Sequence, residues 1–198
     1  MLTIGLTGSI GSGKTIVAAL FKAQGARVVD ADAITRGLIA PGGKAEKKVA
    51  KVFGHAILHS SNKINRVALA KIVFHDPREL KKLTDILYPI GLKEVKKKIA
   101  EAKNTKLIVL DVPLLFESGW NQLADVTIAV QSNKNIQIQR IQKRTGLSKT
   151  DIVRRMKCQM PKKEKMQRAD IVIDNRGKLN QTNAQVKAIV HRLLKRKN

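Results

Sequence analysis

The chain has 198 residues, enough for one globular domain with small insertions, and 43% of them are hydrophobic. The 39 Lys and Arg residues outnumber the 15 Asp and Glu residues, and the formal net charge of +24 predicts attraction to polyanions: nucleic acid, an anionic membrane or highly phosphorylated small molecules. No apolar run is long enough to span a bilayer. The single cysteine, Cys158, excludes an internal disulfide framework and favours a reducing, cytoplasmic location.

Five short apolar runs predict β-strands. None shows clean alternation of apolar and polar residues, which is typical of strands buried on both faces of a parallel sheet. Helical patterns separate them, so the fold class is α/β. The five runs are Leu2–Thr7, Arg27–Asp32, Leu107–Val112, Val126–Val130 and Ile171–Asp174.

The segment GSIGSGKT, residues 8–15, follows the first expected strand and opens a helix that extends to about Gln24. It matches the P-loop pattern through Gly8, Gly13, Lys14 and Thr15. Glycines let the backbone direct successive N–H groups at a phosphate, and the helix adds its positive N-terminal dipole. In such a loop Lys14 reaches the β- and γ-phosphates and the Thr15 hydroxyl binds Mg²⁺. The segment predicts a binding site for a nucleoside triphosphate, and this site also includes Gly11, Ser12 and Ile16.

The second expected strand ends in two carboxylates, Asp30 and Asp32. Ligands bind outside the carboxyl ends of the strands in open α/β sheets. A carboxylate at this edge can accept the proton of an attacking hydroxyl group. We therefore expect Asp32 to act in catalysis, with a helix N-cap as the alternative, and Asp30 to serve as a cap or to support Asp32.

Two helical insertions separate the strands. The stretch that follows Asp32 is too long for a single crossover, and within it Asn65 caps a helix that ends near Phe74, whereas Pro89 and Gly91 interrupt the helical pattern.

The second insertion extends from about Asn133 to Lys165 and predicts two helices around Gly146, the second capped by Ser148. In the C-terminal helix, Thr182 and Gln185 form an expected capping box.

The stretch LIVLDVPLLFESG, residues 107–119, resembles a Walker B strand. Its acid, Asp111, follows four apolar residues and is placed to hold Mg²⁺ or a water of its shell. Leu114, Leu115 and Phe116 are expected to wall an apolar pocket near the phosphates, with core packing as the alternative for the leucines.

As a set, the motifs of this chain resemble those of the dephospho-coenzyme A kinase family. The resemblance implies that ATP, with Mg²⁺, donates its γ-phosphoryl group to the ribose 3′-hydroxyl of dephospho-CoA, giving CoA and ADP. It also implies a P-loop kinase core with a five-stranded parallel sheet of order 2-3-1-4-5. The motifs are TGSIGSGKT at residues 7–15, DAD at 30–32, PLLFE at 113–117, QMPKKEK at 159–165 and RADIVIDNRG at 168–177.

The resemblance also assigns parts of the chain and individual residues. Asp32 matches the general base, Lys14 and Arg140 match groups that neutralise the phosphates, and Arg144 is a further candidate at ATP. Thr145 stands where many members carry an aspartate, and Tyr88 where many carry a histidine. The implied parts are a nucleotide-binding core of residues 1–32, 104–132 and 166–198, a helical CoA-binding insert of residues 33–103 and a lid of residues 133–165.

Two other functions remain as alternatives: a nucleotide or nucleoside kinase, and a nucleic-acid-binding regulator that uses ATP as a switch. No nucleoside monophosphate signature supports the first. Only the charge of +24 supports the second, and an aromatic content of 3% argues against base stacking. The expected partner is therefore dephospho-CoA, with no specific nucleic acid and no membrane. A monomer is expected because so high a charge opposes assembly.

Overall fold

The computed structural model describes residues 1–102 and 104–195. Its contacts divide the chain into two compact units. Unit 1 consists of Met1–Asp30 and the chain from Glu101 onward, and unit 2 is Ala31–Ala100. The boundaries expected from the sequence also include residues 103 and 196–198, which lie outside the described residues. The further separation of a lid from the nucleotide-binding core stays a prediction.

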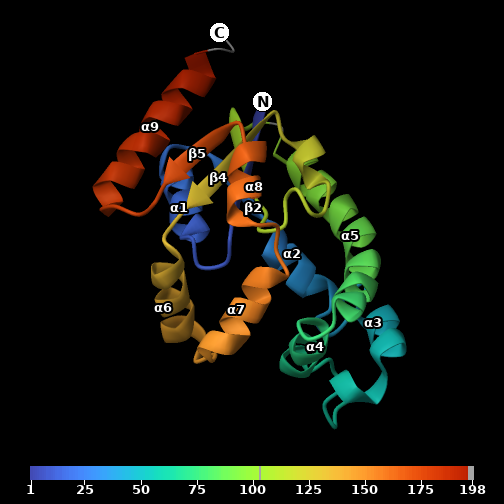
Figure 1. The fold of residues 1–198 in the computed structure, drawn as a ribbon. Helices are drawn as coiled ribbons and strands as arrows, with labels where there is room; N and C mark the ends of the chain where they lie inside the picture. Colours follow the sequence, from blue (N-terminus) through green and yellow to red (C-terminus); the bar gives the residue numbers. More distant parts are fainter. Residues whose placement is uncertain (103, 196–198) are drawn as a thin grey trace. The chain divides into compact units, whose positions relative to one another are not determined.

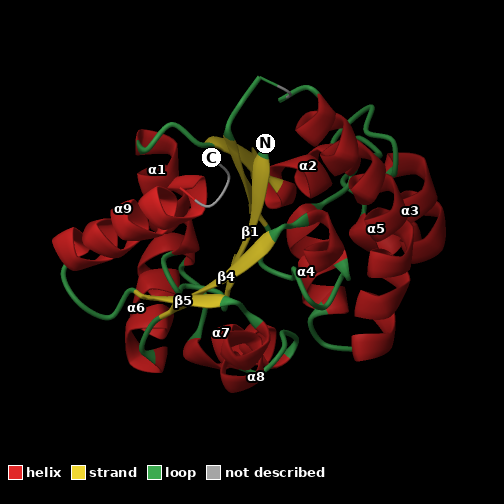
Figure 2. Ribbon diagram, turned by 90° about the horizontal axis from the view of Figure 1, so that it is seen from above, coloured by secondary structure: helices red, strands yellow, loops and turns green. Residues whose placement is uncertain are grey.

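Unit 1 is built on a sheet of five parallel strands in the order β2-β3-β1-β4-β5, which confirms the expected fold. Figure 2 shows β1, β4 and β5 following one another in the sheet. The central strand is buried along its whole length, because it is paired on both edges and its apolar residues belong to the main core. The strands are β1 (Leu2–Gly8), β2 (Arg27–Asp30), β3 (Leu107–Asp111), β4 (Val126–Gln131) and β5 (Ile171–Asp174).

The second strand is shorter than the sequence predicts. The ladder between β2 and β3 ends at the pair Asp30 and Asp111, where β3 also ends, so the chain has no further strand to pair with. Helix α2 (Ala31–Leu38) begins at the next residue. Asp32 therefore lies in the first turn of a helix and not at the end of a strand.

Helices α1 (Lys14–Ala23) and α9 (Leu179–Lys195) pack side by side against the sheet (Figure 1). Their apolar faces join the strands in the main core, which contains Val17, Phe21, Val186 and Val190. The expected capping box was wrong, because α9 already begins at Leu179 and the Thr182 hydroxyl donates to Asn175 Oδ1 at 3.0 Å.

Three helices lie between β4 and β5: α6 (Lys134–Thr145), α7 (Lys149–Lys157) and α8 (Lys162–Arg168). A short 3-10 turn, η2 (Trp120–Leu123), precedes β4. The boundary between α6 and α7 confirms the prediction. Gly146 ends α6 in the left-handed conformation, and the Ser148 hydroxyl caps α7 by accepting from Asp151 N. Helix α8 was not distinguished in the sequence.

Unit 2 is helical and has its own core, which includes Val49, Leu69 and Ile86. The Asn65 side chain caps α4, as expected. The expected break at Pro89 was wrong: α5 continues through it, because buried residues on both sides hold the helix in place. The elements are α2, α3 (Glu46–Phe53), η1 (Gly54–Ile57), α4 (Arg66–Val73) and α5 (Pro77–Ala100). No helix in the described part of the chain has the length and apolar character that crossing a bilayer requires.

Candidate active site

The P-loop connects β1 to α1, and two of its glycines have backbone angles and close neighbours that other residues would not tolerate. Gly11 and Gly13 have φ angles of 77° and 89°, in the left-handed region that favours glycine. A Cβ atom on Gly13 would also overlap the side-chain nitrogen of Asn175. The glycine spacing thus fixes a tight loop at the carboxyl end of the central strand, immediately before the N-terminus of a helix.

Segments distant in sequence hold this loop in position. Ile10 N donates to Gln159 Oε1 at 2.9 Å, and Asn175 Nδ2 donates to the Ser12 carbonyl at 2.8 Å. On the α6 side, the carbonyl oxygen of Gln137 would lie 2.8 Å from a Cβ atom on Gly11, so only glycine fits there. The QMPKKEK and VIDN motifs therefore contain residues that support the loop.

Lys14 and Asp111 form an ion pair at the carboxyl edge of the sheet. The Asp111 side chain is 8% exposed, and its burial raises the pKa of the carboxyl group. The Lys14 ammonium opposes this shift, and nearby Asp30 adds to it, so the pKa remains above its ordinary value. The structure thus brings together the predicted phosphate-binding lysine, the predicted metal-binding carboxylate and Asp30.

A second ion pair lies close by and was missed in the sequence. Lys165 is 1% exposed, and its Nζ lies 3.0 Å from Glu117 Oε1 and donates to the Pro113 carbonyl at 2.7 Å. Burial lowers the pKa of Lys165, the Glu117 carboxylate opposes that shift and Lys14 adds to it. The one available signal was that both residues belong to the PLLFE and QMPKKEK motifs.

The two arginines expected at ATP lie on α6. Arg140 Nη1 would be 3.2 Å from a Cβ atom on Gly13, so this guanidinium reaches the P-loop. Arg144 is exposed one turn later. Thr15 and Ile16 are exposed in the first turn of α1, where a ligand of the loop can reach them.

The three apolar residues expected to wall a pocket have different positions. Leu115 is fully buried and packs against Gly5, whose missing side chain makes the space for it, so for this residue the structure favours core packing, the alternative given above. Leu114 is partly exposed. Phe116 is buried, and the Arg168 guanidinium lies 5.0 Å from the centre of its ring.

Asp32 and Tyr88 belong to unit 2. Asp32 is exposed in the first turn of α2, and Tyr88 lies on α5 directly before Pro89. The sequence links Asp32 closely to the site in unit 1, because only Ala31 separates it from Asp30. Its predicted role as a base stays a prediction.

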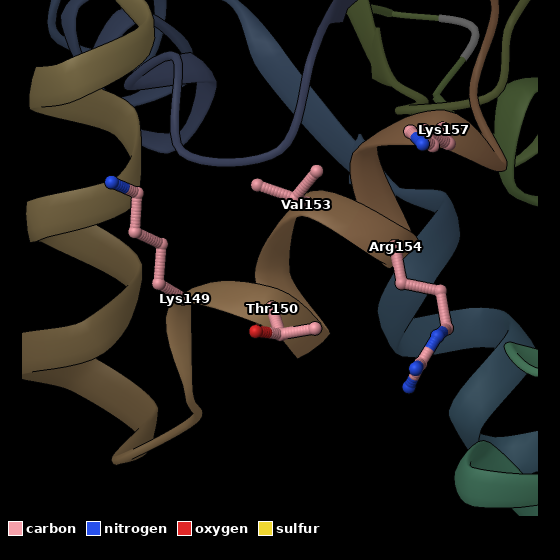
Figure 3. A pocket seen from close by; sticks show the side chains of 5 residues that line it. All are labelled: Lys149, Thr150, Val153, Arg154 and Lys157. Carbon is pink, nitrogen blue, oxygen red and sulfur yellow. The ribbon is translucent and has the colours of Figure 1, made fainter.

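A basic hollow on α7 was not predicted. Figure 3 shows its lining side chains, which all come from this one helix: Lys149, Thr150, Val153, Arg154 and Lys157. They point in different directions, and Arg154 is paired with Asp151 at 3.0 Å.

A five-stranded parallel sheet of this order, with a P-loop between β1 and α1, defines a P-loop kinase fold. The model of the dephospho-CoA kinase family matches residues 2–181. A protein from Syntrophotalea carbinolica named dephospho-CoA kinase is 42% identical over 197 residues, which cover 98% of this chain and 93% of that protein. The chain therefore belongs to the dephospho-CoA kinase family.

Solved structures agree with the fold. A protein from Thermus thermophilus has 34% identity and a TM-score of 0.81, with 97% of each chain covered. A dephospho-CoA kinase from Campylobacter jejuni has 24% identity and a TM-score of 0.69, with 99% of this chain and 98% of that chain covered, and it supports the fold.

Proposed function

We propose that this protein transfers the γ-phosphoryl group of ATP to the ribose 3′-hydroxyl of dephospho-CoA, giving CoA and ADP in the last step of CoA biosynthesis. Family membership supports the reaction. The observation that carries the mechanism is the braced P-loop, whose lysine lies at the start of α1 and opposite Asp111. Phosphoryl transfer needs mainly positioning and compensation of charge, and this arrangement can supply both.

The residues of unit 1 have distinct tasks in this proposal. Backbone N–H groups from Gly11 to Ile16 and the N-terminus of α1 bind the phosphates of ATP. Lys14 pairs with Asp111 when the protein is free, and it exchanges part of that contact for phosphate oxygens when ATP binds. Arg140, which already reaches the P-loop, places its planar guanidinium on the transferring group. Arg144 is a weaker candidate for the same charge.

The residues present fit Mg²⁺. Mg²⁺ prefers oxygen ligands, keeps several waters, and binds through one or two protein groups together with substrate phosphates. Thr15 offers a hydroxyl in the exposed first turn of α1, and Asp111 offers a carboxylate beside Lys14. No cluster of three acidic, His or Cys ligands is found in the part of the chain that is described, and a site shared with ATP does not need one. When bound, the ion would neutralise charge that develops on the phosphates.

The acceptor side rests on unit 2. Asp32 would accept the proton of the 3′-hydroxyl as it attacks, and α2 to α5 would hold dephospho-CoA. Tyr88 stands where many relatives carry histidine, and its phenol would offer a hydrogen bond of different geometry. Leu114 and Phe116 remain candidates for contact with the acceptor, whereas Leu115 is removed from that set by its burial.

The partner in this proposal is a small molecule, and the protein acts as a monomer in the cytoplasm, where ATP is available. Release of ADP from Mg²⁺-ATP tests the function, measured with dephospho-CoA, with AMP or adenosine, and with no acceptor. Release that depends on dephospho-CoA is the expected result. Release that instead depends on AMP or adenosine would replace the acceptor. ATP binding that changes affinity for RNA, with no acceptor-dependent release, would favour the regulator.

A further inference from the structure

A buried contact network connects α8 to the end of β3. Lys165, on α8, is 1% exposed, and its ammonium donates to the Pro113 carbonyl and pairs with Glu117 Oε1 at 3.0 Å. Pro113 lies two residues after Asp111, and its carbonyl also accepts from the Thr7 hydroxyl at 3.0 Å, directly before the P-loop. The lysine therefore links α8 to the segment that follows β3 and, through the shared Pro113 carbonyl, to the end of β1.

The same carboxylate continues the network toward the P-loop tip. Glu117 Oε1 accepts from Met160 N at 2.9 Å. The neighbouring Gln159 accepts from Ile10 N, also at 2.9 Å. Lys165 thus acts on Glu117, Glu117 fixes the backbone at Met160, and the adjacent side chain fixes the loop.

The segment Gln159–Lys165, which we call the return segment, also connects the two ends of the chain that carries α6 and α7. Lys162 Nζ donates to the Ser132 carbonyl at 2.8 Å, immediately before α6 begins. Arg140 lies on that helix, so the return segment fixes the base of the element that carries it.

We propose that Lys165 and Glu117 are positioning residues, which hold Gln159 against Ile10 and thereby set the affinity of the P-loop for the phosphates of ATP. The proposal rests on the proposed function only in taking ATP as the ligand. Stability alone is a weak reason for such a pair, because well-packed apolar residues commonly replace a buried ion pair without loss. The pair is instead placed where a shift of the return segment would move the P-loop tip.

Four variants separate positioning from folding. Lys165→Met removes the ammonium and leaves the Glu117 carboxylate unpaired. Glu117→Gln leaves Lys165 unpaired, but its amide oxygen can still accept from Met160 N. The double variant Lys165→Met/Glu117→Gln removes both charges and retains that acceptor. Gln159→Leu removes only the acceptor for Ile10 N. Lys163→Met is the matched control, since Lys163 is an exposed lysine on the same helix.

The measurement is the Kd of Mg²⁺-ATP by calorimetry without any acceptor, with KM for each substrate, kcat and Tm recorded alongside. We expect Lys165→Met and Gln159→Leu to weaken ATP binding by about tenfold, the effect of one lost hydrogen bond to a positioned group. In these two variants the KM for dephospho-CoA should stay within about twofold of the wild-type value. The double variant should recover most of the ATP affinity of the wild type. Lys163→Met should match the wild type.

The proposal is overturned if Gln159→Leu or Lys165→Met binds ATP like the wild type, or if the double variant is as weak as Lys165→Met. Should Lys165→Met fail to fold, Gln159→Leu still decides, because it removes the contact with Ile10 N directly. A wild-type protein that binds ATP but does not phosphorylate dephospho-CoA contradicts the proposed function and leaves the network proposal to be judged by Kd.

Discussion

Replacing Gly13 by alanine tests how the P-loop is supported. Its φ of 89° costs an L-residue roughly 1–2 kcal/mol. The new methyl group would also displace the Asn175 side chain, which donates to the Ser12 carbonyl and accepts from the Thr182 hydroxyl. Two hydrogen bonds of about 1 kcal/mol each bring the expected loss of folding free energy to about 3–4 kcal/mol.

Gly25 is the matched control. Its φ is 85°, yet nothing lies within 4 Å of the position its Cβ atom would take, so Gly25→Ala carries only the backbone strain. Both substitutions restrict the unfolded chain equally, and that contribution cancels in the comparison. At roughly 2–4 °C per kcal/mol for a chain of this size, Gly13→Ala should melt about 4–8 °C below Gly25→Ala in a thermal unfolding scan. Equal melting temperatures for the two variants would refute the account of Asn175 as a support of the loop.

Three further outcomes are expected. Asp32→Asn should keep the Kd for ATP but lose about 100-fold or more in kcat, measured by ADP release, and near-normal turnover would remove Asp32 as the base. Asp170 accepts from the backbone N–H and the hydroxyl of Thr127, and these bonds lower its pKa. A lowered pKa gives its full stabilisation above the ordinary value of about 3.9, and this is lost as pH falls from there through the lowered pKa. Asp170→Asn should therefore melt lower than the wild type at pH 7, with a difference that shrinks as pH falls below that value; a constant difference would contradict this. Light scattering at moderate salt should give the mass of one chain, and a dimer mass would show that the charge does not prevent assembly.

Much of unit 1 was predictable because its signals are local. The strands are short apolar runs, and the P-loop needs glycine at fixed positions, two of which have positive φ angles. The caps at Ser148 in unit 1 and at Asn65 in unit 2 were found because each contact spans two or three residues. The order of the strands came from the family resemblance, because pairing between distant segments leaves no local pattern.

The residues that were misjudged depend on packing. Lys165 lies in a lysine-rich run, which is typical of a helix face exposed to solvent. Only the fold shows that its side chain is buried against Glu117. The apolar character of Leu115 does not distinguish a pocket wall from the core, and only its burial against Gly5 favours the core. Thr182 matched a capping pattern, but its hydroxyl donates a hydrogen bond to Asn175, seven residues earlier in the chain.

The central claim is transfer of a phosphoryl group to one hydroxyl of one acceptor. The most direct test is to incubate the wild-type protein with Mg²⁺, dephospho-CoA and ATP labelled in the γ-phosphate, and to identify the product by mass and by comparison with authentic CoA. The account predicts a product that carries the label, has gained one phosphate and is indistinguishable from CoA. Label found only in inorganic phosphate, or on a different hydroxyl, would contradict it.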